Sequence, residues 1–437
     1  MNTNKFFAKA KEKGVAVSEL KITKSTSTSI SIFRGKIDDN SISSESKILA
    51  RGIYNGKMGV GSTEKTSDDS IEYLLDSIIS GATLIEKEEE PNIFKGSEKY
   101  HKKNIYSKEL ENWSTNDVLN IMFEIESKLK AKDSRVSDVE VQFAKEEEEK
   151  QMLNSYGLKL KNKTNFFYIY TSVYMKEGDV VKDEGKIVFG TDPKIINVDE
   201  IVDELIKKVS SKFNAITIET GKYKGVLSND SVASLVAALM SNVSSEETQK
   251  HSSLFEGKVN QKVLSSKLTI SEKPLEKNCF FTYFDDEGVA TYNKDIIKKG
   301  VLQTLLYNIE TAKKEGTTST GNGYGRSRID IATVNLTVKP GKLSEDELFA
   351  KIENGVYITS IQGLHAGLNS KSGDFSLQAE GYLVKDGKLD KFLNLFTVGG
   401  NLFKLFNDVI AVGNNSKLFT SSTNCPSIAF KNLKISS

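Results

Sequence analysis

The period at which apolar residues recur changes along the chain, and this change limits the fold more than any other feature. Apolar and polar residues alternate through Val15 to Leu20, Thr28 to Phe33 and Ile48 to Tyr54, as in β-strands with one buried face. The pair Asn55-Gly56 that follows suits the tight turn of a hairpin. The period then becomes helical, with apolar residues at i, i+3, i+4, i+7 and i+8: Ile71, Leu74, Leu75, Ile78 and Ile79. A chain that carries both periods is expected to be an α+β protein.

The two periods alternate as far as residue 213. A second helix is predicted from Thr115, a β-meander from Val139 to Gly190, and a third helix from Val202 to Phe213. The acidic run Glu146 to Glu149 lies within the meander and is interpreted as a solvated strand end or loop. The apolar face of the second helix consists of Val118, Met122, Ile125 and Leu129. These patterns predict an N-terminal α+β domain of residues 1–220, with meandering sheet and amphipathic helices, divisible into subdomains 15–90 and 113–215.

From Gly225 onward the pattern changes to short β-like runs separated by glycines. Three helices interrupt these runs, at Ser231 to Met240, Ser344 to Glu353 and Leu402 to Phe406. In the second of them Ser344 and Glu347 have the spacing of a capping box, and Gly355 is placed to end the helix. Residues 221–437 are therefore predicted to form a mostly β domain, barrel- or sandwich-like. A length of 437 residues suits two such domains.

Charge and hydropathy exclude several classes of partner. The 60 basic and 59 acidic residues leave a formal charge of +1, which supplies no global field for a nucleic acid. No run of 18 apolar residues predicts a membrane span, and the polar N-terminus does not resemble a signal peptide. Cys279 and Cys425 are too far apart in sequence for a zinc knuckle or a disulfide framework. A soluble, cytoplasmic protein without nucleic-acid or membrane partners is expected.

The histidines are few and scattered. A zinc peptidase needs two imidazoles about one turn apart on a helix with a neighbouring glutamate, but His101, His251 and His365 are all isolated in sequence. No G-x-S-x-G elbow or cysteine signature marks a nucleophile. We therefore expect no catalytic residue and no metal ligand in this chain. One alternative remains open, in which His365, Cys425 and Asp374 meet in space and form an atypical site.

Two glycine-rich segments are candidates for a binding role. The first, Thr320 to Arg326, lacks the Lys-Ser/Thr of a phosphate-binding loop and is interpreted as a loop at a cleft. The second, Gly363 to Ser376, is either a tight loop that fixes strand register or a loop that presents its backbone to a ligand. Within it we expect Gly367 to need a positive φ and Asp374 to accept hydrogen bonds from loop N–H groups. The candidate peptide-binding or cleft residues are Gly321, Asn322, Gly323, Gly363, His365, Gly367, Asn369, Gly373 and Asp374.

These motifs resemble those of the TldD/PmbA family, formerly described as modulators of DNA gyrase and now regarded as subunits of cytoplasmic metallopeptidases. The resemblance extends over nearly the whole chain. It rests on Gly363-x-x-x-Gly367-x-Asn369-x-x-x-Gly373-Asp374-Phe375-Ser376, on Thr320-Gly321-Asn322-Gly323, on Ser252 to Val259 ahead of Val263, and on Val398-Gly399-Gly400-Asn401-Leu402.

The resemblance also indicates a branch of that family. Members of the TldD branch carry His-Glu-x-x-x-His on a helix of the C-terminal domain, where the histidines bind metal and the glutamate assists catalysis. The corresponding helix here, Ser231 to Ser245, contains no histidine or glutamate and has an apolar stripe typical of a core helix. The chain is therefore similar to the PmbA/TldE branch, whose members lack the metal motif and associate with TldD.

The resemblance implies a subunit that pairs with a TldD-like chain in a metallopeptidase acting on unstructured peptides, in proteolysis or peptide maturation. It implies no cofactor in this chain and zinc in the partner, and it leaves open a homodimer of the isolated chain. Two alternatives are an autonomous hydrolase with an atypical site, and a binding or regulatory protein without proteolytic association. The first alternative predicts stoichiometric zinc, and the second predicts a topoisomerase partner.

Overall fold

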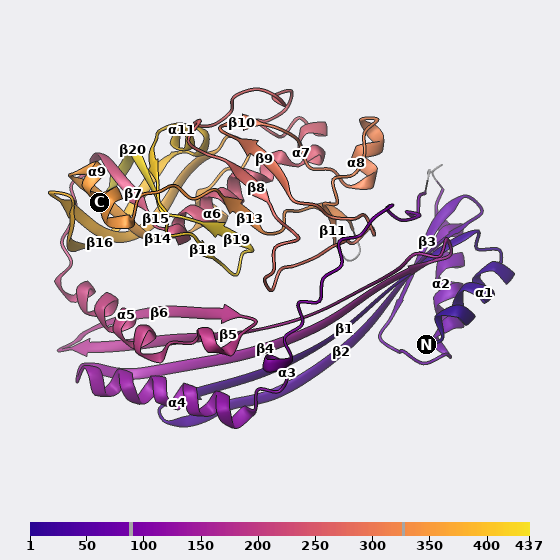
Figure 1. The fold of residues 1–437 in the computed structure, drawn as a ribbon, viewed down its shortest axis with the longest axis horizontal. Helices are drawn as coiled ribbons and strands as arrows, with labels where there is room; N and C mark the ends of the chain where they lie inside the picture. The colour runs from indigo at the N-terminus through magenta and orange to yellow at the C-terminus, as the bar shows by residue number, and fades with distance from the viewer. Residues whose placement is uncertain (87–90, 326–327) are drawn as a thin grey trace. The chain divides into compact units, whose positions relative to one another are not determined.

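The computed structural model describes residues 1–86, 91–325 and 328–437 (Figure 1). It is a mixed α+β structure with 26% helix and 41% strand, which confirms the predicted fold class. The chain divides into two compact units. Unit 1 contains Met1–Tyr174, Asp183–Leu205 and Lys277–Ala290, and unit 2 contains Met175–Lys182, Ile206–Glu276 and Thr291–Ser437. In the part of the chain that the structure describes, no helix has both the length and the apolar character of a membrane span.

Unit 1 is built on a six-stranded sheet in the order β3-β2-β1-β4-β5-β6. The strands are β1 (Val17–Phe33), β2 (Lys36–Tyr54), β3 (Lys57–Thr63), β4 (Val136–Asn154), β5 (Lys159–Glu177) and β6 (Val180–Gly190). β1 pairs antiparallel with β2 and β4, and β2 pairs antiparallel with β3. The predicted turn between β2 and β3 is confirmed, because Asn55 and Gly56 both have positive φ, 48° and 76°.

The helices that begin in unit 1 are α1 (Thr3–Glu12), α2 (Ser70–Leu84), α3 (Lys108–Glu111), α4 (Thr115–Lys132), the short η1 (Pro193–Ile195) and α5 (Val198–Ser211), which runs into η2 (Lys212–Asn214). α2 packs on β2 and β3, and α4 packs on β4. The predicted helix at Thr115 is confirmed. Ser114 and Asp117 form a capping box at its start, and Val118, Met122, Ile125 and Leu129 are buried.

The sequence predicted the acidic run Glu146–Glu149 to be a strand end or a loop. This prediction is wrong, because the run lies in the middle of β4. It pairs with the polar residues Lys24 to Ser27 of β1. Ser27 Oγ donates a 2.6 Å hydrogen bond to Glu146, and Tyr106 donates a 2.7 Å hydrogen bond to Glu147. On the other side of β4, Lys161 of β5 pairs with Glu149 at 2.9 Å. Polar partners on both neighbouring strands allow four consecutive acids to remain in a sheet.

The segment Lys277–Ala290 belongs to unit 1 although it is flanked by residues of unit 2. The Tyr283 hydroxyl donates to the Lys161 carbonyl at 2.6 Å and accepts from the Lys161 N–H at 3.0 Å. Tyr100 donates to the Gly288 carbonyl at 2.7 Å. Phe281 and Tyr283 are buried, each with 2% of its surface exposed. This segment is therefore an integral part of the packing of unit 1.

Unit 2 contains a closed five-stranded barrel, which confirms the predicted β-rich C-terminal region. Its strand order is β16-β15-β14-β7-β20, and pairing of β16 with β20 closes it, while β17 pairs with β20 outside the ring. These strands are β7 (Gly221–Leu227), β14 (Gly355–Gln362), β15 (Asp374–Lys385), β16 (Lys388–Asn401), β17 (Val409–Val412) and β20 (Ile428–Ser436).

A second six-stranded sheet of unit 2 has the order β10-β9-β8-β13-β19-β18. It is formed by β8 (Ile270–Glu272), β9 (Lys294–Lys298), β10 (Val301–Leu302), β13 (Leu336–Val338), β18 (Lys417–Leu418) and β19 (Thr423–Cys425), and a separate ribbon pairs β11 (Gly323–Tyr324) with β12 (Asp330–Ile331). The remaining helices are α6 (Asn229–Met240), η3 (Ser241–Val243), α7 (Ser245–Gln249), α8 (Ile309–Lys314), α9 (Glu345–Ile352), α10 (Leu364–Gly367) and α11 (Leu402–Asn407).

Helix α6 lies in contact with both sheet systems, packing against β7 and β14 of the barrel and β19 of the second sheet (Figure 1). Its buried apolar residues are Val232, Ala233, Leu235, Val236, Leu239 and Met240, all within the main core of unit 2. The apolar stripe seen in the sequence is therefore a core contact. The predicted capping box of α9 is also confirmed at Ser344 and Glu347.

The end of α9 differs from the prediction. The helix stops at Ile352, and the residue that follows its end is Glu353, with a positive φ of 60°, and not Gly355. Gly355 instead begins β14, where an added Cβ would come within 2.1 Å of the Lys224 carbonyl oxygen. The glycine is needed for close strand pairing and does not end the helix.

Candidate functional site

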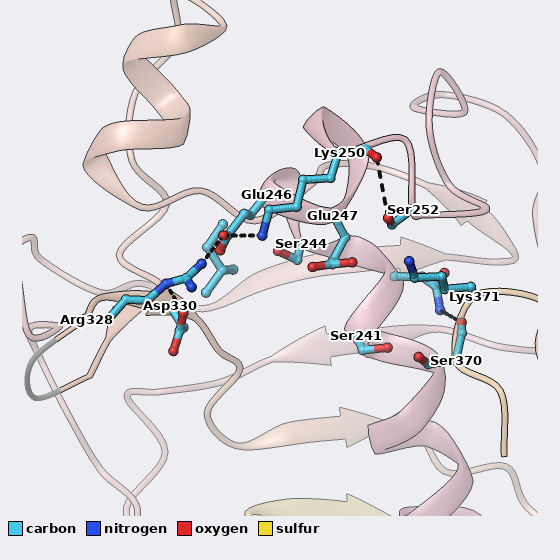
Figure 2. Close-up of a pocket in the computed structure, with 12 residues that line it drawn as sticks. Ser241, Ser244, Glu246, Glu247, Lys250, Ser252, Arg328, Asp330, Ser370 and Lys371 are labelled. Atoms are coloured by element: carbon cyan, nitrogen blue, oxygen red, sulfur yellow. Dashed lines mark hydrogen bonds and ion pairs between the residues drawn. The ribbon is translucent and has the colours of Figure 1, made fainter. Parts of the chain in front are cut away.

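A polar pocket of about 410 Å³ lies where α6 ends and the chain turns through η3 into α7 (Figure 2). Its walls come from three separate parts of unit 2: the α6–α7 connection, the residues around β12, and the loop between β14 and β15. The lining residues are Ser241, Asn242, Ser244, Glu246, Glu247, Lys250, Ser252, Arg328, Asp330, Ile331, Ser370 and Lys371. Hydroxyl, amide and charged groups dominate this set, so the pocket suits a polar ligand.

Asn242 joins the segments that form the pocket and is 3% exposed. Its side-chain oxygen accepts a 3.2 Å hydrogen bond from the Leu254 N–H. Its Nδ2 donates to the Ser370 carbonyl at 3.3 Å and to the Leu239 carbonyl at 3.4 Å. One buried amide thus fixes two loops against the end of α6.

Most charges on one wall of the pocket pair with one another. Glu246 forms ion pairs with Lys250, at 2.6 Å, and with Arg328. Arg328 also pairs with Asp330 at 3.1 Å. Figure 2 shows this chain of contacts running from α7 to the residues around β12. The hydrogen bond from Lys250, with the charge of Arg328, holds the pKa of Glu246 below its ordinary value. This wall is therefore charge-neutralised before any ligand arrives.

A second, more open pocket of about 650 Å³ is formed by the predicted loop itself, from Ala366 to Ser376. Ser370 and Lys371 line both pockets, so the loop is their common wall. The Asn369 side-chain oxygen accepts hydrogen bonds from the Lys371 N–H at 3.0 Å and the Ser372 N–H at 3.1 Å. The turn thus satisfies its own backbone donors with an asparagine.

The roles of the loop residues differ from those inferred from the sequence. Positive φ occurs at Gly363 (83°) and Gly373 (77°), whereas Gly367 does not adopt it. Gly367 is required for another reason, because an added Cβ would lie 2.2 Å from the Ser376 carbonyl oxygen. Among the described residues, the loop N–H groups of Lys371 and Ser372 donate to Asn369, and none is found to donate to Asp374. Asp374 accepts a 2.9 Å hydrogen bond from Asn401, and this bond, with one from Ser372, lowers the pKa of Asp374.

The first glycine-rich segment lies in a different environment from the pocket-forming loop. Gly321, Asn322 and Gly323 are buried, and Asn322 is 0% exposed. Asn322 Nδ2 donates to Glu272 at 2.7 Å and to the Ala332 carbonyl at 2.9 Å, and its oxygen accepts from Thr320 at 2.7 Å. Neither pocket includes these glycines or Asn322. Arg326, the last residue of the predicted segment, lies outside the described residues.

The histidine and the cysteine considered for an atypical site lie in different environments. His365 is exposed on α10, whereas Cys425 is fully buried on β19. Burial raises the pKa of both thiols, Cys279 and Cys425, to about 12, which keeps them protonated at neutral pH. Within residues 1–86, 91–325 and 328–437, no three His, Cys, Asp or Glu side chains are grouped as metal ligands would be.

Asn242, Ser244, Glu246 and Glu247 line the pocket but are not among the residues predicted from the sequence. A signal was present, because an apolar helix is followed at once by the polar run Ser241 to Gln249, in which Val243 is the only apolar residue. Such a run marks the place where a buried helix reaches the surface. It did not indicate that loop 363–376 would lie opposite.

We expect Asn242→Ala to destabilise the protein by about 1 to 2 kcal/mol, because the buried amide of Asn242 loses its hydrogen bonds to Leu254 and Ser370 on two loops. Thermal or urea unfolding measures this change. The matched control is Ser241→Ala, next to it in sequence but exposed, which should change stability by less than about 0.5 kcal/mol. Equal effects of both variants would contradict the role given to Asn242.

Comparison with known families covers most of the chain. The PmbA/TldA metallopeptidase domain 1 matches residues 18–82, the central domain matches 108–213, and the C-terminal domain matches 220–437. The metalloprotease PmbA homolog of Buchnera aphidicola subsp. Acyrthosiphon pisum is 26% identical over 285 residues, which are 65% of this chain and 62% of that protein. The metalloprotease PmbA of Escherichia coli O157:H7 is 27% identical over 52% of this chain and 49% of its own length. The chain thus matches less than two thirds of these curated relatives.

Solved structures align over nearly the full length. A Thermotoga maritima MSB8 protein named as a modulator of DNA gyrase is 27% identical, with a TM-score of 0.92 over 99% of each chain. TldE from Thermococcus kodakarensis is 23% identical, with a TM-score of 0.91 over 100% of each chain, and shows the same fold.

Proposed function

Because this chain belongs to the PmbA/TldA metallopeptidase family, here called TldD/PmbA, we propose that it is the subunit without a metal site in a two-chain peptidase. Its partner is a TldD-like chain that carries the zinc, and the substrate is an unstructured peptide. The observation that carries this proposal is the environment of α6. This helix packs between the barrel and the second sheet with an apolar stripe, where the resemblance places two histidines and a glutamate in the TldD branch.

The residues that the structure describes do not fit a catalytic metal site. A zinc site of a peptidase needs three protein ligands with a position left open for water. The described part of α6 carries only Asp230 as an acidic residue and no histidine or cysteine. His251 has an 80% exposed side chain, and its ring pairs with Glu256. Without a metal, neutral-pH attack on an amide needs an activated nucleophile, and the high pKa of both cysteines disfavours that role.

The pocket beside α6 supports a role in holding substrate or contacting the partner. It lies at the C-terminal end of α6, the helix that the resemblance matches to the metal-binding helix of the other branch. Its polar lining offers donors and acceptors to a peptide backbone, and the loop 363–376 forms one wall. A subunit with a pocket but without metal ligands can bind a peptide without cleaving it.

Reconstitution tests the proposal directly. The purified chain is expected to contain no stoichiometric zinc by elemental analysis and to leave a fluorogenic unstructured peptide intact. Addition of a TldD-like partner should produce EDTA-sensitive cleavage faster than the partner gives alone. As a control, a partner with its motif glutamate changed to glutamine should form the complex and remain inactive.

Other results would support the alternatives. Near-equimolar zinc with EDTA-sensitive turnover by this chain alone would establish an autonomous hydrolase and overturn the proposal. Capture of a topoisomerase without any TldD-like protein in a pull-down from the native cell would support the regulatory role.

A further inference from the structure

Two charged side chains of the polar pocket have no ion-pair partner among the described residues: Glu247 on α7 and Lys371 on loop 363–376. They differ in this from their neighbours, since Glu246, Lys250, Arg328 and Asp330 all pair with one another. Figure 2 shows Glu247 and Lys371 as sticks from different elements that line the same pocket. Of the described charged residues that line the pocket, one carboxylate and one ammonium group are therefore without an ion-pair partner.

The positions of both groups are set by the surrounding contacts. Glu247 follows the paired Glu246 in α7, and its carbonyl accepts a 2.8 Å hydrogen bond from the Ser252 N–H. Lys371 donates its backbone N–H to Asn369, while the preceding Ser370 carbonyl accepts from the buried Asn242. Ser253, next to Ser252, donates its hydroxyl to the Asn242 carbonyl at 2.6 Å. Asn242 therefore contacts the segments next to both charged residues.

A ligand that carries both an ammonium and a carboxylate group would satisfy both side chains. Charge-assisted hydrogen bonds are stronger than neutral ones, and partial exclusion of water increases their contribution. Glu247 is half-buried, so pairing it in a pocket favours a ligand more than pairing an exposed acid would. The volume of about 410 Å³ is within the range of small-molecule sites and suits more than one amino-acid residue.

We propose that this pocket binds a short peptide with free termini, its α-ammonium group at Glu247 and its α-carboxylate at Lys371. The hydroxyl groups of Ser244, Ser252 and Ser370 provide partners for the peptide groups between the two ends. The choice of a peptide over another zwitterion rests on the proposed function. The arrangement of charges in the pocket does not depend on the proposed function. Short peptides with both termini free are the products that a peptidase releases.

The test uses isothermal titration calorimetry on the full chain alone, with diglycine, triglycine and tetraglycine as probes. At least one of these should bind saturably at one site. N-acetylation or C-terminal amidation of the best probe should each weaken binding about tenfold or more, the loss expected for one charge-assisted contact. Equal affinity of the free and capped peptides, or absence of binding by all three probes, would overturn the proposal.

Two variants assign the ends. With Lys371→Met, the free and the C-terminally amidated peptide should bind with equal affinity, while N-acetylation should still weaken binding. With Glu247→Gln, the free and the N-acetylated peptide should bind with equal affinity, while amidation should still weaken binding. The controls are Lys385→Met, at the opposite end of β15 from Asp374, and Glu310→Gln on α8, neither of which lines the pocket. Both controls should bind like the unchanged chain. If the pocket variants also bind like the unchanged chain, the peptide binds elsewhere and the assignment is wrong.

The peptide-binding experiment and the reconstitution experiment can fail independently of each other. Binding of the glycine peptides is measured without partner, zinc or turnover. A chain that fails to bind them but supports cleavage with a TldD-like partner would refute only this inference. A chain that binds them with the predicted discrimination but has no proteolytic partner would refute only the proposed function.

Discussion

Replacing Lys294 with methionine is expected to destabilise the protein by about 3 to 5 kcal/mol at pH 7 to 8, the largest effect predicted for a single substitution. Lys294 and Glu272 form an ion pair in unit 2 with side chains only 6% and 1% exposed. Glu272 also accepts hydrogen bonds from Asn322 at 2.7 Å and from the Val334 N–H at 2.8 Å. Burial raises the pKa of Glu272, and the Lys294 ammonium and these donors oppose that rise. The methionine variant leaves a buried carboxylate without its cation.

The loss should depend on pH in a defined direction. Without Lys294, the folded-state pKa of Glu272 rises further above its unfolded value, so the folded state favours the protonated acid. Stability linked to a raised pKa is present below the unfolded value and is lost as pH increases through the folded value. The variant should therefore be less impaired near pH 5 than near pH 8. Urea unfolding of the unchanged chain and the variant at both pH values measures the difference.

Lys298→Met provides the matched control. Lys298 lies on the same strand, β9, but its side chain is 60% exposed and its ion pair with Asp295 spans 3.4 Å. An exposed pair of this kind contributes less than about 1 kcal/mol. Similar losses for both lysines, or a Lys294 variant whose deficit grows at low pH, would contradict the interpretation of Glu272 as a buried ionised partner.

Gly367→Val is expected to cost about 3 kcal/mol, because overpacking against backbone cannot be relieved by a rotamer change. An added Cβ at this position would lie 2.2 Å from the Ser376 carbonyl oxygen and 3.1 Å from Leu377 Cδ2. Both belong to β15, a strand of the closed barrel, so the clash is transmitted to a sheet that has limited freedom to move. Thermal unfolding should show a marked decrease in Tm.

Gly363 is the control position for Gly367 within the same loop. It has a φ of 83° and no atom within 4 Å of an added Cβ. Asparagine tolerates this region of φ better than most residues, so Gly363→Asn should lose only about 1 kcal/mol. If the Gly363 variant were the more damaged of the two, backbone conformation and not close approach would be the dominant requirement of this loop.

The sequence predicted best those elements whose burial follows a simple period. The helix at Thr115, the Asn55-Gly56 turn and the α9 capping box are all found as expected, because caps and apolar stripes are local signals. The sequence predicted strands less well where their residues are mostly polar. Most of β2 from Lys36 to Ser46 is exposed and carries no alternation, so nothing in those residues distinguishes a strand from a loop.

The residues that line the candidate pocket were predicted only in part. Loop 363–376 was identified from its glycines, but Gly321, Asn322 and Gly323 looked the same in sequence and lie in a buried network instead. Local composition does not report which of two glycine-rich turns meets a pocket, since that depends on contacts between distant segments. The opposing wall came from the α6–α7 connection, more than 100 residues away in sequence, as the 128-residue separation of Asn242 and Ser370 illustrates.

The assignment of Lys277–Ala290 to unit 1 has a consequence for how the protein is made. A ribosome releases the chain from its N-terminus, and domains generally fold as they emerge. Unit 1 remains incomplete until Ala290 has been synthesised, long after its sheet has been translated. Until then the surface that receives Phe281 and Tyr283 stays open to solvent and to other nascent chains. The waiting period exposes apolar surface during translation, and it gives chaperones a defined interval in which to act before the late segment docks.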